Sequence, residues 1–163
     1  MKRILAIAIT VCIACTLFVG CNGSSNETAT QPTYNMPHGL DAHQYCLFVN
    51  RHINVVANQL TTQAMLSSRF AGNDLESFIA SAENSLQVII DSRYEVEIMA
   101  PPAQYAENRV NTLRLMDNAR NDVECLLHEL KETNVDLDAV NALASQMQTD
   151  FIALLAEFDV YYK

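Results

Sequence analysis

The sequence predicts an all-α fold: an antiparallel up-down-up-down four-helix bundle that follows a cleaved signal and a flexible spacer. Apolar residues recur at spacings of three and four along most of residues 38–163, and no useful stretch shows the alternation that is typical of a β-strand. Strong helix breakers occur in this part only at Gly39, Gly72 and Pro101-Pro102. Together with a break near Asn134, they divide the domain into four segments of similar length.

The first predicted helix covers about residues 39–69, and the second follows Asn73 and ends before Pro101. The apolar stripe of the first contains Cys46, Val49, Ile53, Val56 and Leu60. Between the two helices, Gly72 is expected to close one and Asn73 to cap the next. The stripe of the second contains Leu75, Ile79, Ala82, Leu86, Ile89, Arg93 and Val96.

The third predicted helix covers about residues 102–132, with Pro102 in its first turn. Its stripe contains Leu113, Met116, Ala119, Val123, Leu126, Leu127 and Leu130. The fourth helix shows the most regular pattern of the chain, a heptad seam of Leu137, Val140, Ala144, Met147, Phe151, Leu154, Phe158 and Tyr161. Short turns between consecutive helices make neighbours antiparallel.

The first 20 residues have the layout of an export signal. Lys2 and Arg3 precede an apolar run that reaches Gly20, which is the order of regions in a secretory signal peptide. The run falls short of the ~20 residues that span a bilayer comfortably. We therefore expect residues 1–20 to be removed.

The apolar run ends in Leu17-Phe18-Val19-Gly20-Cys21, with a small residue directly before the cysteine. This motif resembles the lipobox of bacterial prolipoproteins, and the resemblance covers only residues 1–21. It implies that a diacylglycerol, with acyl chains such as palmitate, is attached to Cys21, which becomes the new N-terminus. It also implies an exported protein that is anchored by its lipid at the extracytoplasmic face of a bacterial membrane.

Residues 21–37 combine the lipidated cysteine with a spacer of small and polar residues, which we expect to be a flexible coil. The chain carries a net charge of −9, and removal of Lys2 and Arg3 would make it more negative. Nucleic acid is therefore excluded as a partner, because its backbone is bound by Lys and Arg. No metalloprotease, phosphate-loop or nucleophile-elbow motif is present, so we expect neither an enzyme nor a cofactor.

In this register, the tyrosines gather at the end of the bundle where the first helix begins, next to the tether. They are Tyr45, Tyr94, Tyr105, Tyr161 and Tyr162, and Tyr34 of the spacer lies close in sequence. A tyrosine can pack its flat apolar ring against a neighbour while its hydroxyl remains in contact with water. The tyrosines therefore either cap the end of the bundle or contact a ligand.

Basic residues fall near the same end, namely Arg51, Arg93 and Arg109 with His52 beside them. Arg93 occupies a stripe position, so its guanidinium needs a carboxylate. The candidates are Glu95, Glu107, Glu157 and Asp159. Two interpretations remain open: an ion-paired rim, or an anion site built from Arg93 and Arg109 with Tyr94, Tyr105 and Tyr161 as its walls.

Two cysteines lie beyond the anchor, Cys46 and Cys125. The first and third helices run parallel, which puts these thiols ~20 Å apart along the axis, whereas a disulfide needs Cα atoms within about 7 Å. We predict two free thiols that act as small core or near-core residues. His43 with Cys46 supplies at most two ligands, and Glu124 with His128 does not match the di-iron pattern, so no metal site is expected.

Leu47, Phe48 and Val55 lie off the main stripe of the first helix, so either the spacer or a partner protein covers them. The leading functional hypothesis is a lipid-anchored protein of the cell envelope, whose helical bundle is an interaction or structural module with an unidentified protein partner. The alternative is a lipoprotein that binds a small anion or a metal at its tyrosine- and arginine-rich, membrane-proximal end.

Overall fold

The computed structural model describes residues 40–161 of the chain. The predicted signal peptide, Cys21, the spacer with Tyr34, and Tyr162 lie outside the described residues. The described part contains four α-helices and no strand: α2 (Ala42–Ser67), α3 (Leu75–Ile98), α4 (Ala106–Lys131) and α5 (Leu137–Val160). A short 3-10 turn, η1 (Ala103–Tyr105), precedes α4. The prediction of an all-α four-helix fold is confirmed.

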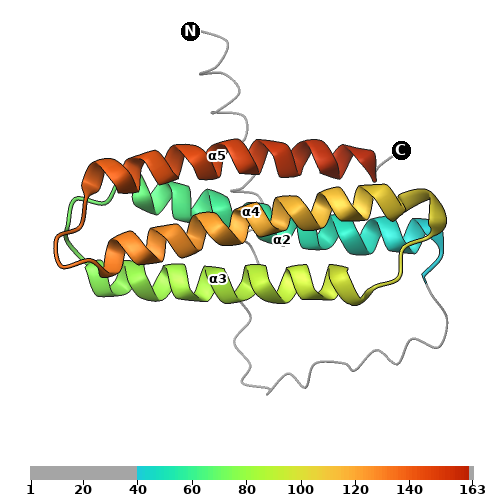
Figure 1. Ribbon diagram of the computed structural model, residues 1–163, viewed down its shortest axis with the longest axis horizontal. Coiled ribbons are helices and arrows are strands. Elements are labelled where there is room, and N and C mark those ends of the chain that lie inside the picture. The colour runs from blue at the N-terminus through green and yellow to red at the C-terminus, as the bar shows by residue number, and fades with distance from the viewer. Residues whose placement is uncertain (1–39, 162–163) are drawn as a thin grey trace, which may run out of the picture. The chain divides into compact units, whose positions relative to one another are not determined.

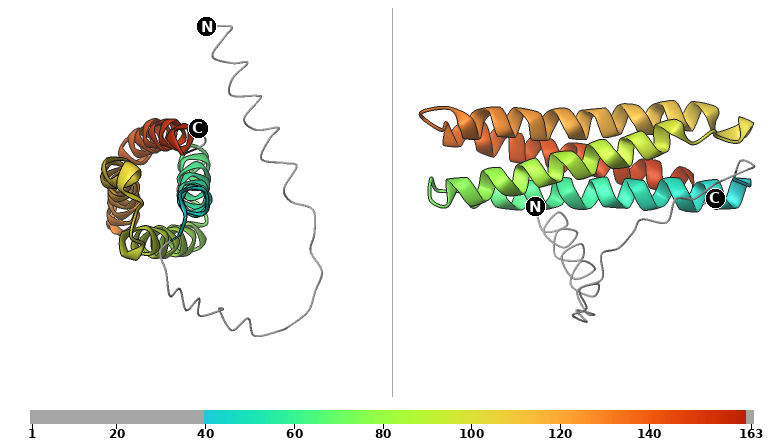
Figure 2. Two further views of the ribbon diagram at one scale, coloured as in Figure 1. Left: turned by 90° about the vertical axis from the view of Figure 1, so that its right-hand side faces the viewer. Right: turned by 90° about the horizontal axis from the view of Figure 1, so that it is seen from below.

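The helices form a closed square, which Figure 2 shows in a view along the bundle. Each helix packs against its neighbours in the chain, and α2 also packs against α5, so that α2 and α4 face each other across a diagonal. Consecutive helices run in opposite directions (Figure 1), which confirms the up-down-up-down order. One end of the bundle therefore holds the start of α2, η1 and the end of α5, and we call it the α2-start end.

Local signals explain where the helices begin. Asp41 caps α2, because its carboxylate accepts from Gln44 N at 2.8 Å and the Gln44 side chain accepts from Asp41 N at 3.3 Å. Asp136 caps α5 by accepting from the backbone N–H groups of residues 138 and 139. Gly72 has a φ of +87°, a conformation in which glycine is favoured, and it lies in the turn between α2 and α3.

The prediction that Asn73 caps α3 is wrong. The residue before α3 is Asp74, whose φ of 56° is left-handed and whose side chain makes no capping hydrogen bond. A left-handed φ is uncommon outside glycine, but aspartate adopts it more often than most other residues. Pro102 also lies outside α4, since the 3-10 turn comes between them.

The buried face of α3 is rotated relative to the predicted stripe. It contains Phe78, Ala82, Ser85, Ile89, Ser92 and Val96. Leu75, Ile79 and Leu86 are only half-buried and pack at its edge. The difference arises because Ser85 and Ser92 face the interior, where polar side chains of α2 hydrogen-bond to Ser85.

The core lies between all four helices and is built as the stripes of α2, α4 and α5 predict. Ile53, Met116 and Leu154 are completely buried, and each such side chain stabilises the fold by about 1.5–3 kcal/mol. On α5, the seam is buried from Val140 to Tyr161, except that its two phenylalanines are half-buried. Leu137, the first residue of that seam, is 40% exposed.

Candidate functional site

Three of the predicted tyrosines lie together at the α2-start end. The ring centroids of Tyr45 and Tyr105 are 5.9 Å apart and nearly stacked, at an interplanar angle of 20°. Tyr161 completes the cluster, with centroids 6.2 Å from Tyr45 and 5.5 Å from Tyr105. Such distances are typical of favourable aromatic pairs. Tyr45 and Tyr161 are buried, so these rings fill the end of the core.

The hydroxyl of Tyr161 enters a small polar network between α4 and α5. It lies 3.0 Å from Thr112 Oγ1, which also lies 2.9 Å from the carbonyl oxygen of Asn108 and 3.4 Å from Glu157 Oε1. Thr112 has one hydroxyl proton, so the short bond to Asn108 is satisfied if Tyr161 donates to Thr112. The other oxygen of Glu157 accepts from Asn111 Nδ2 at 2.5 Å. Burial raises the pKa of Tyr161, so its proton remains available for this network.

The hydroxyl of Tyr45 has no such partner. It is enclosed and accepts or donates no hydrogen bond within the described part of the chain. Burial raises the pKa of Tyr45 to about 12, although the positive charge of Arg109 acts in the opposite direction. Tyr94 is separate from the cluster, because its side chain points outward from α3 and is 57% exposed.

Arg93 binds carboxylates, but not those that the sequence analysis named. Its guanidinium donates to both oxygens of Asp117 on α4, with Nε at 2.6 Å from Oδ1 and Nη2 at 3.2 Å from Oδ2. Nη1 donates to Glu97 one turn along α3, at 2.7 Å. This hydrogen bonding raises the pKa of Arg93. The predicted partners were wrong because the rotation of α3 directs Arg93 toward α4 and not into the core.

Arg109 closes the C-terminal end of α3. Its Nε donates to the carbonyl oxygen of Val96 at 3.3 Å, and Nη2 donates to that of Glu97. The last carbonyl groups of a helix lack partners within the helix, and a cation is stabilising there. Arg93 thus binds the carboxylate of Glu97, and Arg109 binds its backbone carbonyl oxygen. Both guanidinium groups are therefore already bound to acceptors of the protein.

The cysteines are free, as predicted, with Cys46 buried and Cys125 exposed. The expectation that Cys125 is a near-core residue is wrong, because it lies on the outward side of α4. His43, the predicted neighbour of Cys46, is exposed. Within residues 40–161, no group of three or more metal-ligating side chains comes together.

The off-stripe residues of α2 differ from one another. Leu47 is 57% exposed, whereas Phe48 and Val55 are half-buried. The ring of Phe48 lies 4.6 Å from that of His52. Burial, with the charge of Arg51, lowers the pKa of His52.

A hollow of about 460 Å³ lies at the opposite end of the bundle, between the end of α2 and the start of α3. Arg69, Phe70, Asp74 and Phe78 are among the residues that line it. The arginines and tyrosines of the candidate anion site do not line this hollow.

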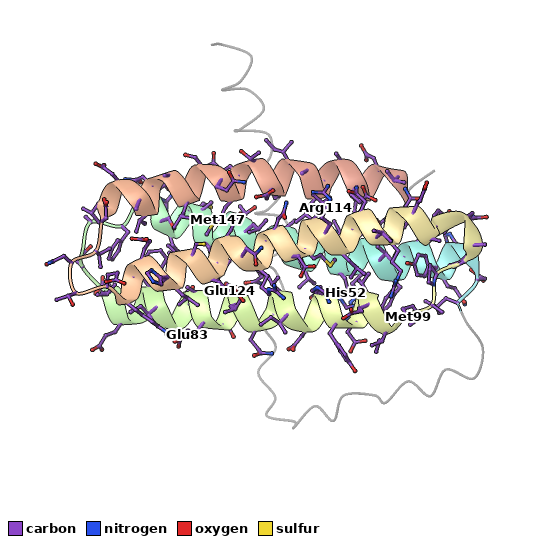
Figure 3. The ribbon with its side chains drawn as sticks, in the orientation of Figure 1. His52, Glu83, Met99, Arg114, Glu124 and Met147 are labelled. Carbon is purple, nitrogen blue, oxygen red and sulfur yellow. The ribbon has the colours of Figure 1, made fainter. Side chains whose placement is uncertain are left out.

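Three acids are buried at the interface of α4 and α5, of which Asp122 and Asp150 were not predicted and Glu157 was named only as a candidate partner of Arg93. Asp122 is 9% exposed, and Asp150 and Glu157 are each 6% exposed. Asp150 follows the buried Met147, labelled in Figure 3, by one turn. A signal was present for Asp122, which fills the position between Ala119 and Leu126 at spacings of three and four.

The interface of α2 and α3 also contains polar residues, but they are uncharged. Gln63 is completely buried, and its Nε2 lies 2.7 Å from Ser85 Oγ, 3.1 Å from Ser81 Oγ and 3.2 Å from the carbonyl oxygen of Ser81. Ser85 in turn donates to Gln59 Oε1 at 2.8 Å. Amide and hydroxyl groups of Gln59, Gln63, Ser81 and Ser85 thus connect the two helices.

None of the helices within residues 40–161 combines the length and the apolarity that a bilayer crossing requires. Comparisons of the chain with protein-family models, curated proteins and solved structures found no match.

Proposed function

We propose that this chain is a lipid-anchored protein of the bacterial cell envelope, in which Cys21 carries the anchor and the helical bundle is an interaction or structural module. The observation that carries the proposal is the motif Leu17–Cys21 at the end of a basic and then apolar leader. Two or three acyl chains hold a protein at a membrane, because each buried CH₂ contributes ~0.8 kcal/mol.

Two features of the bundle support a module that acts through its surface. The candidate residues for a small-anion site, Arg93 and Arg109, already bind protein acceptors. By contrast, α3 presents three exposed apolar side chains at intervals of four residues, Ile90 at 37%, Tyr94 at 57% and Ile98 at 56% exposure. A row of exposed apolar side chains on a protein with a net charge of −9 is typical of a contact surface.

Metabolic labelling with a palmitate analogue tests the anchor directly. The full chain is expressed in a bacterial host, beside Cys21→Ala and the control Cys15→Ala, which removes a cysteine of the same leader. We expect label in the unchanged chain and in Cys15→Ala, and none in Cys21→Ala. Label that persists in Cys21→Ala, or an unlabelled wild-type chain, would contradict the proposal.

A further inference from the structure

The interface between α4 and α5 contains a pair of carboxyl groups that are largely shielded from water while the helices are packed. Asp122 on α4 and Asp150 on α5 are 9% and 6% exposed. Asp122 lies in the apolar stripe of α4, and Asp150 lies beside the seam of α5. A buried carboxylate is unfavourable unless hydrogen bonds and an opposite charge compensate for the lost water.

Compensation by hydrogen bonds is incomplete. Asp150 Oδ2 accepts one hydrogen bond, from Gln146 Nε2 at 2.7 Å. Asp122 Oδ2 is enclosed and has no hydrogen-bond partner within the described residues. A proton on one of the two carboxyl groups would supply the missing bond, because a protonated carboxyl is a donor and an ionised one is not.

Compensation by charge is also missing, since the basic side chains of α4 are directed elsewhere. Arg114 donates to Asn111 Oδ1 at 2.7 Å, and Arg120 lies 3.5 Å from Asp117 and 3.4 Å from Glu124. Arg114 and Glu124 are labelled on α4 in Figure 3. The bases near the ends of α4 bind other groups: Arg109 binds the end of α3, His128 lies 3.7 Å from Glu132, and Lys131 binds Glu83 at 2.6 Å.

The other helices bring no opposite charge. On α5 there is no Lys, Arg or His, and its other buried acid is Glu157. Between Ile53 and Ser67, α2 has no titratable residue. On α3, the exposed Asp91 accepts from Gln87 at 2.8 Å, and Arg93 is bound to Asp117. No ion pair within residues 40–161 includes Asp122 or Asp150.

We propose that Asp122 and Asp150 form a buried proton-binding site, in which one shared proton holds α4 against α5 and its loss at higher pH loosens this interface. Glu157 is a contrasting group on the same interface, because its Oε2 accepts a hydrogen bond from Asn111 Nδ2 on α4. The proposal does not depend on the lipid anchor.

The titration of Asp122 has the direction that this site requires. Burial, followed by the hydrogen bond that a proton would form with Asp150 and the charge of Asp150, raises the pKa of Asp122 to about 7. An unfolded aspartate titrates near pH ~3.9, so the folded state binds the proton more tightly. The stabilisation is complete below the unfolded pKa and is lost as the pH rises through about 7.

The test is the pH profile of urea unfolding, followed by circular dichroism on the full chain in a mild detergent from pH 5 to pH 8. The variant is Asp122→Asn, which has the same shape and no titration, and the control is Asp91→Asn, which removes an exposed carboxylate. We expect the folded-to-unfolded ratio of the wild type to fall, relative to that of Asp122→Asn, by up to about tenfold per pH unit below pH 7. Asp91→Asn should follow the wild type.

The difference between the profiles is decisive, because burial lowers the pKa of His52 and its titration changes the stability of wild type and variant alike, with the opposite sign. Profiles of Asp122→Asn and wild type that run parallel from pH 5 to pH 8 would overturn the proposal. If Asp122→Asn does not fold, Asp150→Asn takes its place. From pH 5 to pH 8, the folded-to-unfolded ratio of Asp150→Asn should fall less than that of the wild type. An equal fall in both proteins would also overturn the proposal.

Discussion

Two interfaces of this bundle contain buried polar residues, and they differ in the chemistry of those residues. Between α2 and α3, Gln63 and Ser85 are buried and uncharged. Between α4 and α5, the buried residues include Asp122 and Asp150. Both arrangements interrupt an apolar seam, and hydrogen bonds across such a seam favour one register of the two helices. Only the second arrangement contains groups whose charge changes with pH.

The comparison shows that the fold alone does not decide how an interface responds to its surroundings. The same square of four helices holds one buried contact, between Gln63 and Ser85, that contains no titratable group and one interface whose stability is linked to a proton. We expect the α4–α5 interface to weaken as the pH rises and the contact between Gln63 and Ser85 to be unaffected.

The largest effect on stability is expected when a carboxyl group, as found in the α4–α5 interface, is introduced into the α2–α3 interface. Gln63→Glu should destabilise the fold by about 2–4 kcal/mol at pH 8, because a buried carboxylate cannot donate to the serines of α3. The loss should be smaller at pH 5, where the introduced carboxyl group can take up a proton and donate one bond. Urea unfolding of Gln63→Glu and of the wild type at pH 5 and at pH 8 measures the loss of unfolding free energy at each pH.

The matched control for this change is Gln148→Glu, which makes the same substitution at an exposed position of α5. It should change the free energy of unfolding by less than about 0.5 kcal/mol. A loss for Gln63→Glu that is equally large at pH 5 and pH 8 would show that the α2–α3 interface fails for steric reasons and not because of charge.

A smaller effect on stability is expected at the hydrogen bond between Tyr161 and Thr112 in the α4–α5 interface. Tyr161→Phe removes the hydroxyl that lies 3.0 Å from Thr112 and should cost about 1 kcal/mol. Since burial raises the pKa of Tyr161, the loss should be the same at pH 5 and pH 8. Thermal unfolding of Tyr161→Phe is best compared with Tyr94→Phe, an exposed tyrosine for which no loss is expected. A loss for Tyr161→Phe that changes with pH would link this hydroxyl to the acids.

The smallest effect is expected at the interface of α3 and α4, where charges meet near the surface. The side chains of Arg93 and Asp117 are 22% and 33% exposed. A double-mutant cycle with Arg93→Met and Asp117→Asn should give a coupling of about 0.5–1 kcal/mol that decreases with added salt. A coupling of several kcal/mol that salt does not change would mean that this pair behaves as a buried one.

Much of the fold could be predicted from the sequence because long helices show a regular spacing of apolar residues. The seam from Val140 to Tyr161 and the stripe of α2 set both the helices and their buried faces. The gathering of Tyr45, Tyr105 and Tyr161 followed from the register alone. The same reasoning predicted the wrong buried face for α3. Ser85 and Ser92 are buried there, and a pattern of apolar residues does not include serine.

The acids of the α4–α5 interface were missed for a related reason. A pattern of apolar residues does not include Asp122 and Asp150, and only the structure shows that helix packing buries them. The partner of Arg93 could not be predicted because it depends on the rotation of α3 by a fraction of a turn. Sequence spacing does not fix that rotation when small polar residues can face the core.

Carbon-13 NMR of the aspartate carboxyl groups tests the central difference between the two interfaces most directly. The full chain, labelled at aspartate and held in detergent, is titrated from pH 3 to pH 9, and Asp122→Asn assigns the signal. The account predicts that the carboxyl of Asp122 changes its chemical shift with a midpoint near pH 7. If the Asp122 signal completes its titration below about pH 5, as in an ordinary aspartate, the α4–α5 interface holds no such proton and the account is contradicted.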